Sequence, residues 1–249
     1  MSRPDRKPRL HWDSLAQIDP DAAVIDPHDL RGLKNQYLAG IRDAAFRQSL
    51  QRYGVEHGTL LDLGCGTGSA TRPLINAGHR VIGVDISKSL LRHARARCNE
   101  DDCLFVQTDG LQLPIADRSL DATVIYGVLI YLVDDAQAQA LLSQVRAALK
   151  PGAPLIMIEQ VRRHRRLTEQ GLKCQRSRQE WISLVEAAGF SVQEHRILRH
   201  GRFPATPLIR AGLIPRRLWP LAHYLETRIA ARTGVFPWDY AEALFVATA

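Results

Sequence analysis

From residue 59 onward, short apolar runs alternate with longer stretches of mixed polarity. Runs of this length that are rich in Val, Ile and Leu predict buried strands, and the longer stretches predict helices. The predicted strands span residues 59–63, 80–85, 103–107, 120–126, 153–159, 191–198 and 243–248. The predicted helices span residues 67–77, 87–97, 135–149 and 178–188. Ser87 is a suitable cap for the second of these helices.

This alternation predicts right-handed crossovers and one α/β domain, with a seven-stranded, mostly parallel sheet sandwiched by helices. Two segments lie outside it. Residues 1–55 are expected to form an N-terminal helical cap, and residues 56–249 the domain proper. Residues 199–240 form an insertion before the last strand. Because ligands bind at the carboxyl ends of the strands in such sheets, we expect this insertion to be a substrate lid.

The net charge of +7 is concentrated in one part of the chain. Residues 161–240 carry 15 Lys or Arg against 6 Asp or Glu, whereas residues 1–160 carry 18 against 19. This asymmetry favours an acidic or membrane-proximal partner, although a solvated arginine-rich surface explains it equally well. The N-terminus lacks the apolar region of a signal peptide, and the four cysteines form no C-x-x-C pair. We therefore expect a cytoplasmic protein, with peripheral membrane contact as an option.

The first predicted strand leads into a glycine-rich stretch, "LLDLGCGTGSAT" at residues 60–71. Its glycines are Gly64, Gly66 and Gly68, whereas the dinucleotide fingerprint requires a glycine where this chain has Ser69. Asp62, beside this turn, would repel a pyrophosphate and attract a positively charged ligand. S-adenosylmethionine has this chemistry, because it carries a sulfonium, an ammonium, a ribose and an adenine.

Four stretches, in order and spacing, resemble the successive motifs of class I S-adenosylmethionine-dependent methyltransferases. They read "LLDLGCGTGSAT", "VIGVDIS", "FVQTDGLQLPIADRSLDATVIYGVLIYL" and "ALKPGAPLIMIE". The resemblance covers roughly residues 59–160 and is strongest to the small-molecule branch, of the kind called methyltransferase type 11-like. It implies a Rossmann-like sheet and S-adenosylmethionine as the cofactor.

The resemblance also implies roles for individual residues. Asp62 and the three glycines would lie near the methionine part and the sulfonium, with Asp85 on the ribose hydroxyls and Asp109 on the adenine amino group. Tyr37 could reach the methionine end from an N-terminal helix. The full set of expected cofactor-binding residues is Asp62, Gly64, Cys65, Gly66, Gly68, Asp85, Ile86, Asp109, Gly110, Leu111, Tyr126 and Tyr37. No metal site is expected.

The sequence offers several candidates for a catalytic role. Many relatives carry a histidine after the fourth strand, where this chain reads "YGVLIYL". A base is required only if the acceptor must lose a proton. The candidates at the strand ends are Glu159, Tyr126 and Tyr131, although Glu159 could instead cap a helix or pair with the arginines at 162–166. His200 is a further candidate, whose alternative is an ordinary surface histidine.

We therefore expect a methyltransferase acting on an O or N atom of a small molecule or glycan, including phosphorylated or lipid-linked ones. A non-catalytic S-adenosylmethionine-binding regulator is one alternative. The other is an RNA methyltransferase that uses the basic C-terminal third, which the scarcity of aromatics there disfavours. Within the insertion, Leu218, Leu221, Ala222, Leu225 and Ile229 share one helical face. That face could pack on the domain, form a basic lid, or lie on an anionic membrane.

Overall fold

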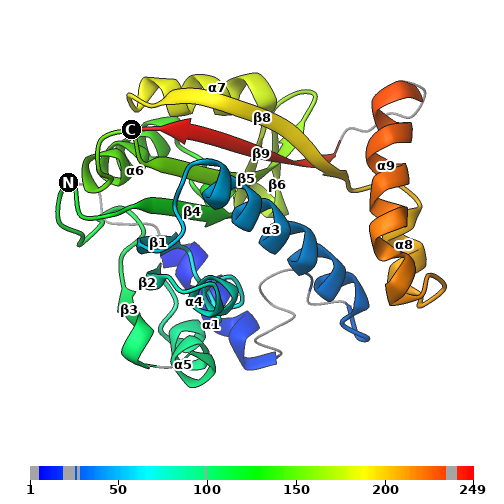
Figure 1. Cartoon of the computed structure of the whole chain (residues 1–249), viewed down its shortest axis with the longest axis horizontal. Helices are drawn as coiled ribbons and strands as arrows, with labels where there is room; N and C mark the ends of the chain where they lie inside the picture. The colour runs from blue at the N-terminus through cyan, green and yellow to red at the C-terminus, as the bar shows by residue number, and fades with distance from the viewer. Residues whose placement is uncertain (1–5, 19–25, 27–28, 99, 234–239) are drawn as a thin grey trace.

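The computed structural model describes residues 6–18, 26, 29–98, 100–233 and 240–249. Its central sheet has the strand order β3-β2-β1-β4-β5-β9-β8 (Figure 1). The strands are β1 (Thr59–Leu63), β2 (Arg80–Asp85), β3 (Cys103–Gln107), β4 (Ala122–Tyr126), β5 (Pro154–Arg162), β8 (Ser191–His200) and β9 (Ala241–Thr248). β1 to β5 are parallel to one another, and β9 runs antiparallel to both β5 and β8. The predicted seven-stranded, mostly parallel sheet is confirmed.

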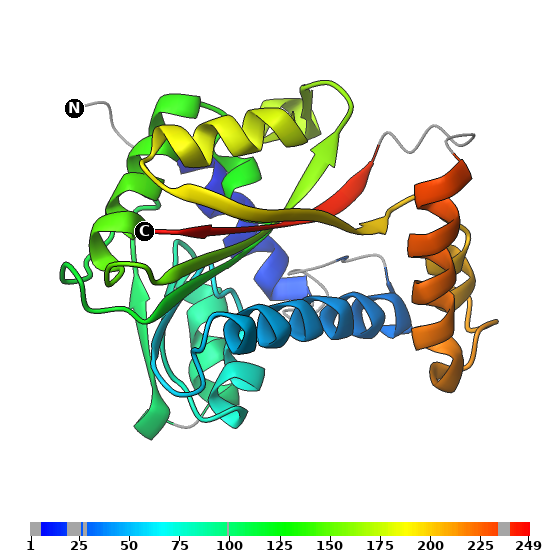
Figure 2. The same cartoon turned by 45° about the horizontal axis from the view of Figure 1, so that its top comes forward.

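Alternate residues of each central strand face opposite sides of the sheet, as strand geometry requires. In β5, Leu155 and Met157 belong to the core beneath α6 (Asp135–Ala148) and α7 (Arg178–Ala187). Ile156 and Ile158 belong to the core beneath α3 (Leu33–Arg52) and α4 (Thr71–Asn76). Figure 2 shows α7 and α3 on the two sides of the sheet. A strand buried on both faces reads as a continuous apolar run, which explains why the central strands were predictable.

Element boundaries follow local chemistry. The helix predicted from Thr67 begins at Thr71, because residues 67–70 form a turn in which Gly68 adopts a positive φ of 75°. Ser87 caps α5 (Lys88–Arg97), with its Oγ accepting from Leu90 N at 3.1 Å. The predicted cap is confirmed.

A hairpin between β5 and α7 was not predicted. It consists of β6 (Arg166–Thr168) and β7 (Lys173–Ser177), joined by the short turn η3 (Glu169–Gly171). β7 pairs in parallel with the last residues of β5. Its polar sequence, KCQRS, has no apolar run, so only the contacts of the folded chain reveal it as a strand.

Helices frame the carboxyl ends of the strands from the two segments outside the alternation. From the N-terminal segment, α1 (Arg6–Ile18) packs on α5, where Ser87 Oγ donates to Asp13 Oδ1 at 2.6 Å. From the insertion, α8 (Ala205–Arg210) packs on α3, and α9 (Trp219–Thr233) packs on β8. In Figures 1 and 2, α8 and α9 form one end of the molecule. The division into a cap at 1–55 and a domain at 56–249 stays a prediction. Among the described residues, no helix is long and apolar enough to cross a membrane.

Candidate functional site

Two adjoining cavities lie at the carboxyl ends of the parallel strands. The larger has a volume of about 1070 Å³ and is bounded by the glycine loop, the end of β2 and the loop after β3. The smaller has a volume of about 430 Å³ and is bounded by the ends of β4, β5, β8 and β9. Tyr126, Gly127 and Tyr131 line both cavities, as do His11 and Trp12 of α1. A ligand of the larger cavity could therefore meet a ligand of the smaller one beside Tyr126.

The glycine loop borders the larger cavity with main chain instead of side chains. Gly64 has a φ of 74°, and a Cβ built on it would overlap the side chain of Val128. Gly64 N and Cys65 N donate to Val84 O at 2.8 and 3.1 Å, which joins the loop to β2. Both the positive φ and the close approach of Val128 require glycine at position 64.

Asp85, the last residue of β2, connects the loop to the cavity. Its Oδ2 accepts from Gly66 N at 2.9 Å and its Oδ1 from Ser87 N at 2.8 Å. Burial raises the pKa of Asp85 to about 6, against the lowering effect of these main-chain donors. Each carboxylate oxygen can accept more than one hydrogen bond, so both can still receive a hydroxyl. The prediction that Asp85 binds a ribose fits this position.

The residues expected around an adenine lie together at the end of β3. Asp109 Oδ1 accepts from Leu111 N at 2.9 Å and from Gln112 N at 2.8 Å, which fixes the turn. A Cβ on Gly110 would come within 3.0 Å of Ile86 Cγ2, so the two chain segments meet closely there. Ile86, Asp109, Gly110 and Leu111 all line the larger cavity.

Four expected cofactor-binding residues lie behind the wall of the cavities: Asp62, Cys65, Gly68 and Tyr37. Asp62 is buried, and its Oδ2 accepts from Thr71 Oγ1 at 2.6 Å. Burial raises the pKa of Asp62 to about 6.

The other three residues, Cys65, Gly68 and Tyr37, are also buried. Cys65 packs in the core beneath α5, where a Cβ on Gly68 would lie 3.4 Å from Ala94. Tyr37 packs its ring against Trp219, with ring centroids 5.7 Å apart.

Glu159, near the end of β5, lines the smaller cavity. Its Oε1 accepts from Val128 N at 2.9 Å and from Leu129 N at 2.7 Å, which fixes the loop after β4. Its Oε2 is buried and has no hydrogen-bond partner among the described residues. Burial raises the pKa of Glu159 to about 7. An ionisable group with a spare oxygen and a pKa near neutrality is suited to proton transfer.

The two tyrosine candidates lie between the cavities. Arg42 of α3 stacks over the ring of Tyr126, 5.3 Å from its centroid. Trp12 of α1 contacts Tyr131 edge to face at 5.1 Å, and Lys173 Nζ lies 5.2 Å from the Tyr131 ring centroid. Burial raises the pKa of both tyrosines above its ordinary value, so both hydroxyls stay protonated near neutral pH. His200 lines neither cavity, and its main-chain N donates to Glu226 Oε1 at 2.5 Å.

Sequence reasoning missed two parts of the cavity wall. The turn of the β6–β7 hairpin contributes Glu169 and Gln170 to the larger cavity, and Lys173 lines the smaller one. The first turns of α1 contribute Arg9 and His11. Residues 1–55 were expected to form a helical cap, but no motif singled out Arg9 and His11 within it or the residues of the hairpin.

The residues around the larger cavity fit S-adenosylmethionine. Glycines at 64 and 66, a carboxylate at Asp85 and apolar side chains at Ile86 and Leu111 line one cavity, and these groups suit its polar and aromatic parts. By contrast, the described part of the chain contains no group of three or more His, Cys, Asp or Glu side chains that could hold a metal ion.

Known proteins are similar to this chain in sequence. Residues 60–152 match the family described as a methyltransferase domain. A demethylmenaquinone methyltransferase of Tropheryma whipplei is 33% identical over 127 residues, which are 50% of this chain and 52% of that protein. A probable S-adenosylmethionine-dependent methyltransferase of Mycolicibacterium smegmatis is 27% identical over 190 residues, 72% of this chain and 66% of that protein. The chain thus spans about half the length of the first of these relatives.

The fold is also found in solved structures. Phosphoethanolamine N-methyltransferase 2 of Haemonchus contortus, in complex with S-adenosyl-L-methionine, superposes with a TM-score of 0.61 at 19% identity. The superposition covers 86% of this chain and 52% of that one. Residues 60–152 thus match a methyltransferase domain, and the chain shares the fold of this S-adenosyl-L-methionine-bound methyltransferase.

Proposed function

We propose that this protein transfers a methyl group from S-adenosylmethionine to an O or N atom of a small-molecule acceptor. The observation that carries the proposal is the junction of the two cavities at Tyr126. There the larger cavity, bounded by the glycine loop and Asp85, adjoins the smaller cavity that contains Glu159.

The residues of the larger cavity have distinct tasks in this proposal. Asp85 accepts the ribose hydroxyls, Ile86 and Leu111 pack on the adenine, and Asp109 accepts from its amino group. The cofactor supplies a methyl group already activated on a sulfonium. The protein then has to align the acceptor with that methyl and exclude water, which α1 supports by covering the cavity with Trp12.

Glu159 is the proposed base. Glu159 lines the smaller cavity, its Oε1 accepts from main-chain N–H groups, and its buried Oε2 has no hydrogen-bond partner among the described residues. Oε2 would take the proton that the acceptor hydroxyl or amine gives up as its O or N attacks the methyl. Tyr126 and Tyr131 are then proposed to orient the acceptor, because a protonated phenol donates a hydrogen bond.

The smaller cavity favours an acceptor with an uncharged ring over a phosphorylated one. Each of its three cationic side chains is already paired with a carboxylate. The pairs are Lys34–Asp26 at 2.5 Å, Lys173–Glu169 at 2.6 Å and Arg199–Glu242 at 3.0 Å. Trp12, Tyr131 and Tyr240 provide aromatic surface. A ring acceptor that carries a hydroxyl or amino group suits such a lining.

Calorimetric titration with S-adenosylhomocysteine, with NADH as the control ligand, tests the cofactor. We expect micromolar binding of the first, on the order of −8 kcal/mol, and none of the second. Transfer of a radiolabelled methyl to a panel of hydroxylated quinones, sugars and amines then tests the reaction. Cofactor binding without transfer to any acceptor would support the non-catalytic regulator instead. RNA binding that weakens steeply with salt would support the RNA methyltransferase.

A further inference from the structure

The apolar stripe of α9 faces away from the protein. Glu226 and Ala230, on the inner side of α9, are 0% and 6% exposed. Leu221 and Leu225 of α9 are 52% and 42% exposed, and Leu218 of the short turn η4 (Arg216–Leu218) before it is 42% exposed. The exposed leucines therefore do not pack on the described part of the domain, which was one of the three interpretations left open by the sequence. In Figures 1 and 2 this helix stands at the end of the molecule.

The segment that contains these leucines is strongly basic. Among the described residues between 200 and 230, five arginines are exposed: Arg202, Arg210, Arg216, Arg217 and Arg228. The only acidic residue in this range is Glu226, which is buried. No exposed carboxylate in this range therefore offsets the positive charge.

We propose that this surface docks on an anionic lipid bilayer. The outer α9 face, as we use the term, consists of Arg216, Arg217, Leu218, Leu221, Tyr224, Leu225, Arg228 and Ile229. Leucines on one helical face with flanking arginines are the composition of helices that lie in a membrane interface, with leucines in the acyl boundary and arginines at anionic headgroups.

Other occupants fit this surface less well. A second copy of the chain would bring two sets of exposed arginines together without acidic partners on this face. A core-forming contact within the chain is excluded for the described residues, because the stripe is exposed there. An exposed apolar patch with basic flanks is therefore best complemented by negatively charged lipid.

Docking in this orientation has a consequence for the candidate site. Arg199 and Tyr240, the first and last residues of the insertion, both line the smaller cavity. The insertion thus links the outer α9 face to the proposed acceptor cavity. A membrane-borne acceptor is the substrate class that this link favours; this last step alone rests on the proposed function.

Vesicle co-sedimentation of the full chain tests the docking without any need for activity. Wild-type protein should bind vesicles of phosphatidylcholine with about 30 mol% phosphatidylserine, and bind vesicles of phosphatidylcholine alone at least about tenfold more weakly. Two double variants, Arg216→Glu/Arg217→Glu and Leu221→Asp/Leu225→Asp, should each weaken binding to the anionic vesicles by about tenfold or more. The affected side chains are exposed, so thermal unfolding should stay close to wild type.

A matched control has the same change in net charge elsewhere. Arg47 on α3 and Arg92 on α5 are exposed, and Arg47→Glu/Arg92→Glu should change vesicle binding by less than about threefold. Equal losses in the control and in Arg216→Glu/Arg217→Glu would show that only net charge matters and would overturn the proposal. So would absence of binding to anionic vesicles, or dimers in solution that Leu221→Asp/Leu225→Asp dissociates.

Discussion

Arg42 Nη2 donates to the main-chain oxygen of Ser69 at 2.8 Å, while its Nη1 donates to Ser69 Oγ at 3.0 Å. A buried arginine of α3 is thereby attached to the end of the glycine loop. Its Nε donates to Asp43 Oδ1 at 2.8 Å, which balances the charge. The N-terminal helix is thus part of the framework that holds the proposed cofactor loop, in addition to covering one face of the sheet.

Arg42→Met should therefore lower both stability and cofactor affinity. The change leaves Ser69 O and the Asp43 carboxylate without their donor, which we expect to cost about 3 kcal/mol of unfolding free energy. Urea denaturation measures this cost, and calorimetry with S-adenosylhomocysteine measures the loosening of the loop. Arg47→Met on the exposed side of the same helix is the control. Similar stability of the two variants would contradict the role of Arg42.

Asp85 should make cofactor affinity depend on pH. Because burial raises the pKa of Asp85 to about 6, the carboxylate that accepts from Gly66 and Ser87 is lost as the pH falls below 6. We expect the affinity for S-adenosylhomocysteine to fall from pH 7 to pH 5. Asp85→Asn should weaken binding about tenfold at pH 7 and reduce this pH dependence.

Asp85 should make the stability of the unliganded protein change with pH in the direction opposite to the cofactor affinity. A carboxyl whose pKa is raised on folding holds a proton more tightly in the folded chain than in the unfolded one. Its contribution to the free energy of unfolding therefore rises as the pH falls from about 6 toward 4.

Asp62→Asn is the matched control for the affinity measurement, since burial also raises the pKa of Asp62 to about 6 but Asp62 lines neither cavity. A loss of affinity in Asp62→Asn equal to that in Asp85→Asn would revive the expected contact of Asp62 with the cofactor.

Glu159→Gln should separate catalysis from folding. The glutamine oxygen can still accept from Val128 N and Leu129 N, so the loop after β4 should stay in place. Loss of the base should lower kcat about 100-fold while leaving the affinity for S-adenosylhomocysteine within about threefold. In the wild type, kcat should rise with pH through about 7, the value to which burial raises the pKa of Glu159. A variant with unchanged kcat and an unchanged pH profile would assign Glu159 to loop support alone.

The elements that the sequence predicted well are those with a single dominant signal. β2 and β3 were predicted to the residue, because each is a short apolar run bounded by polar residues. The glycine loop and Asp85 were placed together at one cavity because a known motif fixes their spacing. Local sequence suffices where one strand, one turn and one cap determine the geometry.

The rest depends on contacts between distant segments. The β6–β7 hairpin is held by Arg176 and by pairing to β5. No local sequence pattern predicts either interaction. The apolar stripe of α9 was visible in the sequence, but its outward orientation depends on Glu226 being buried against β8. Similarly, Tyr37 was expected near the cofactor, yet Trp219 of the insertion packs against it.

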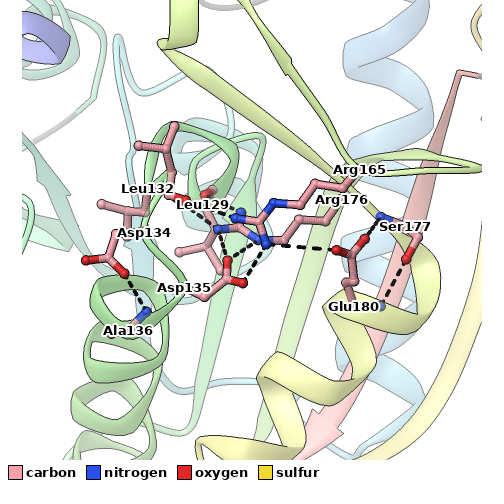
Figure 3. A network of polar contacts seen from close by, with 10 residues as sticks. Leu129, Leu132, Asp134, Asp135, Ala136, Arg165, Arg176, Ser177 and Glu180 are labelled. Atoms are coloured by element: carbon pink, nitrogen blue, oxygen red, sulfur yellow. Dashed lines mark hydrogen bonds and ion pairs between the residues drawn. The ribbon is translucent and has the colours of Figure 1, made fainter.

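The base of the hairpin should depend on Arg176 far more than on Arg165 (Figure 3). Arg176 is buried and donates to Asp135 Oδ1 from Nε at 2.8 Å and to Leu132 O from Nη2 at 2.7 Å. Arg165 also pairs with Asp135, but its side chain is 37% exposed. Arg176→Met should cost about 3 kcal/mol and Arg165→Met less than about 1 kcal/mol. Thermal and urea unfolding compare the two, and equal costs would contradict the burial argument.

Gly64→Ala should disrupt the loop for two reasons that a second substitution can separate. A positive φ of 74° costs a non-glycine residue roughly 1 kcal/mol, and the added methyl overlaps the side chain of Val128. We expect the affinity for S-adenosylhomocysteine to fall at least about tenfold. Adding Val128→Ala removes the overlap but not the backbone strain, so it should restore part of the affinity. A single Val128→Ala variant measures the effect of that change alone. If the double variant binds no better than Gly64→Ala, the overlap with Val128 is not the cause, and backbone strain alone explains the loss.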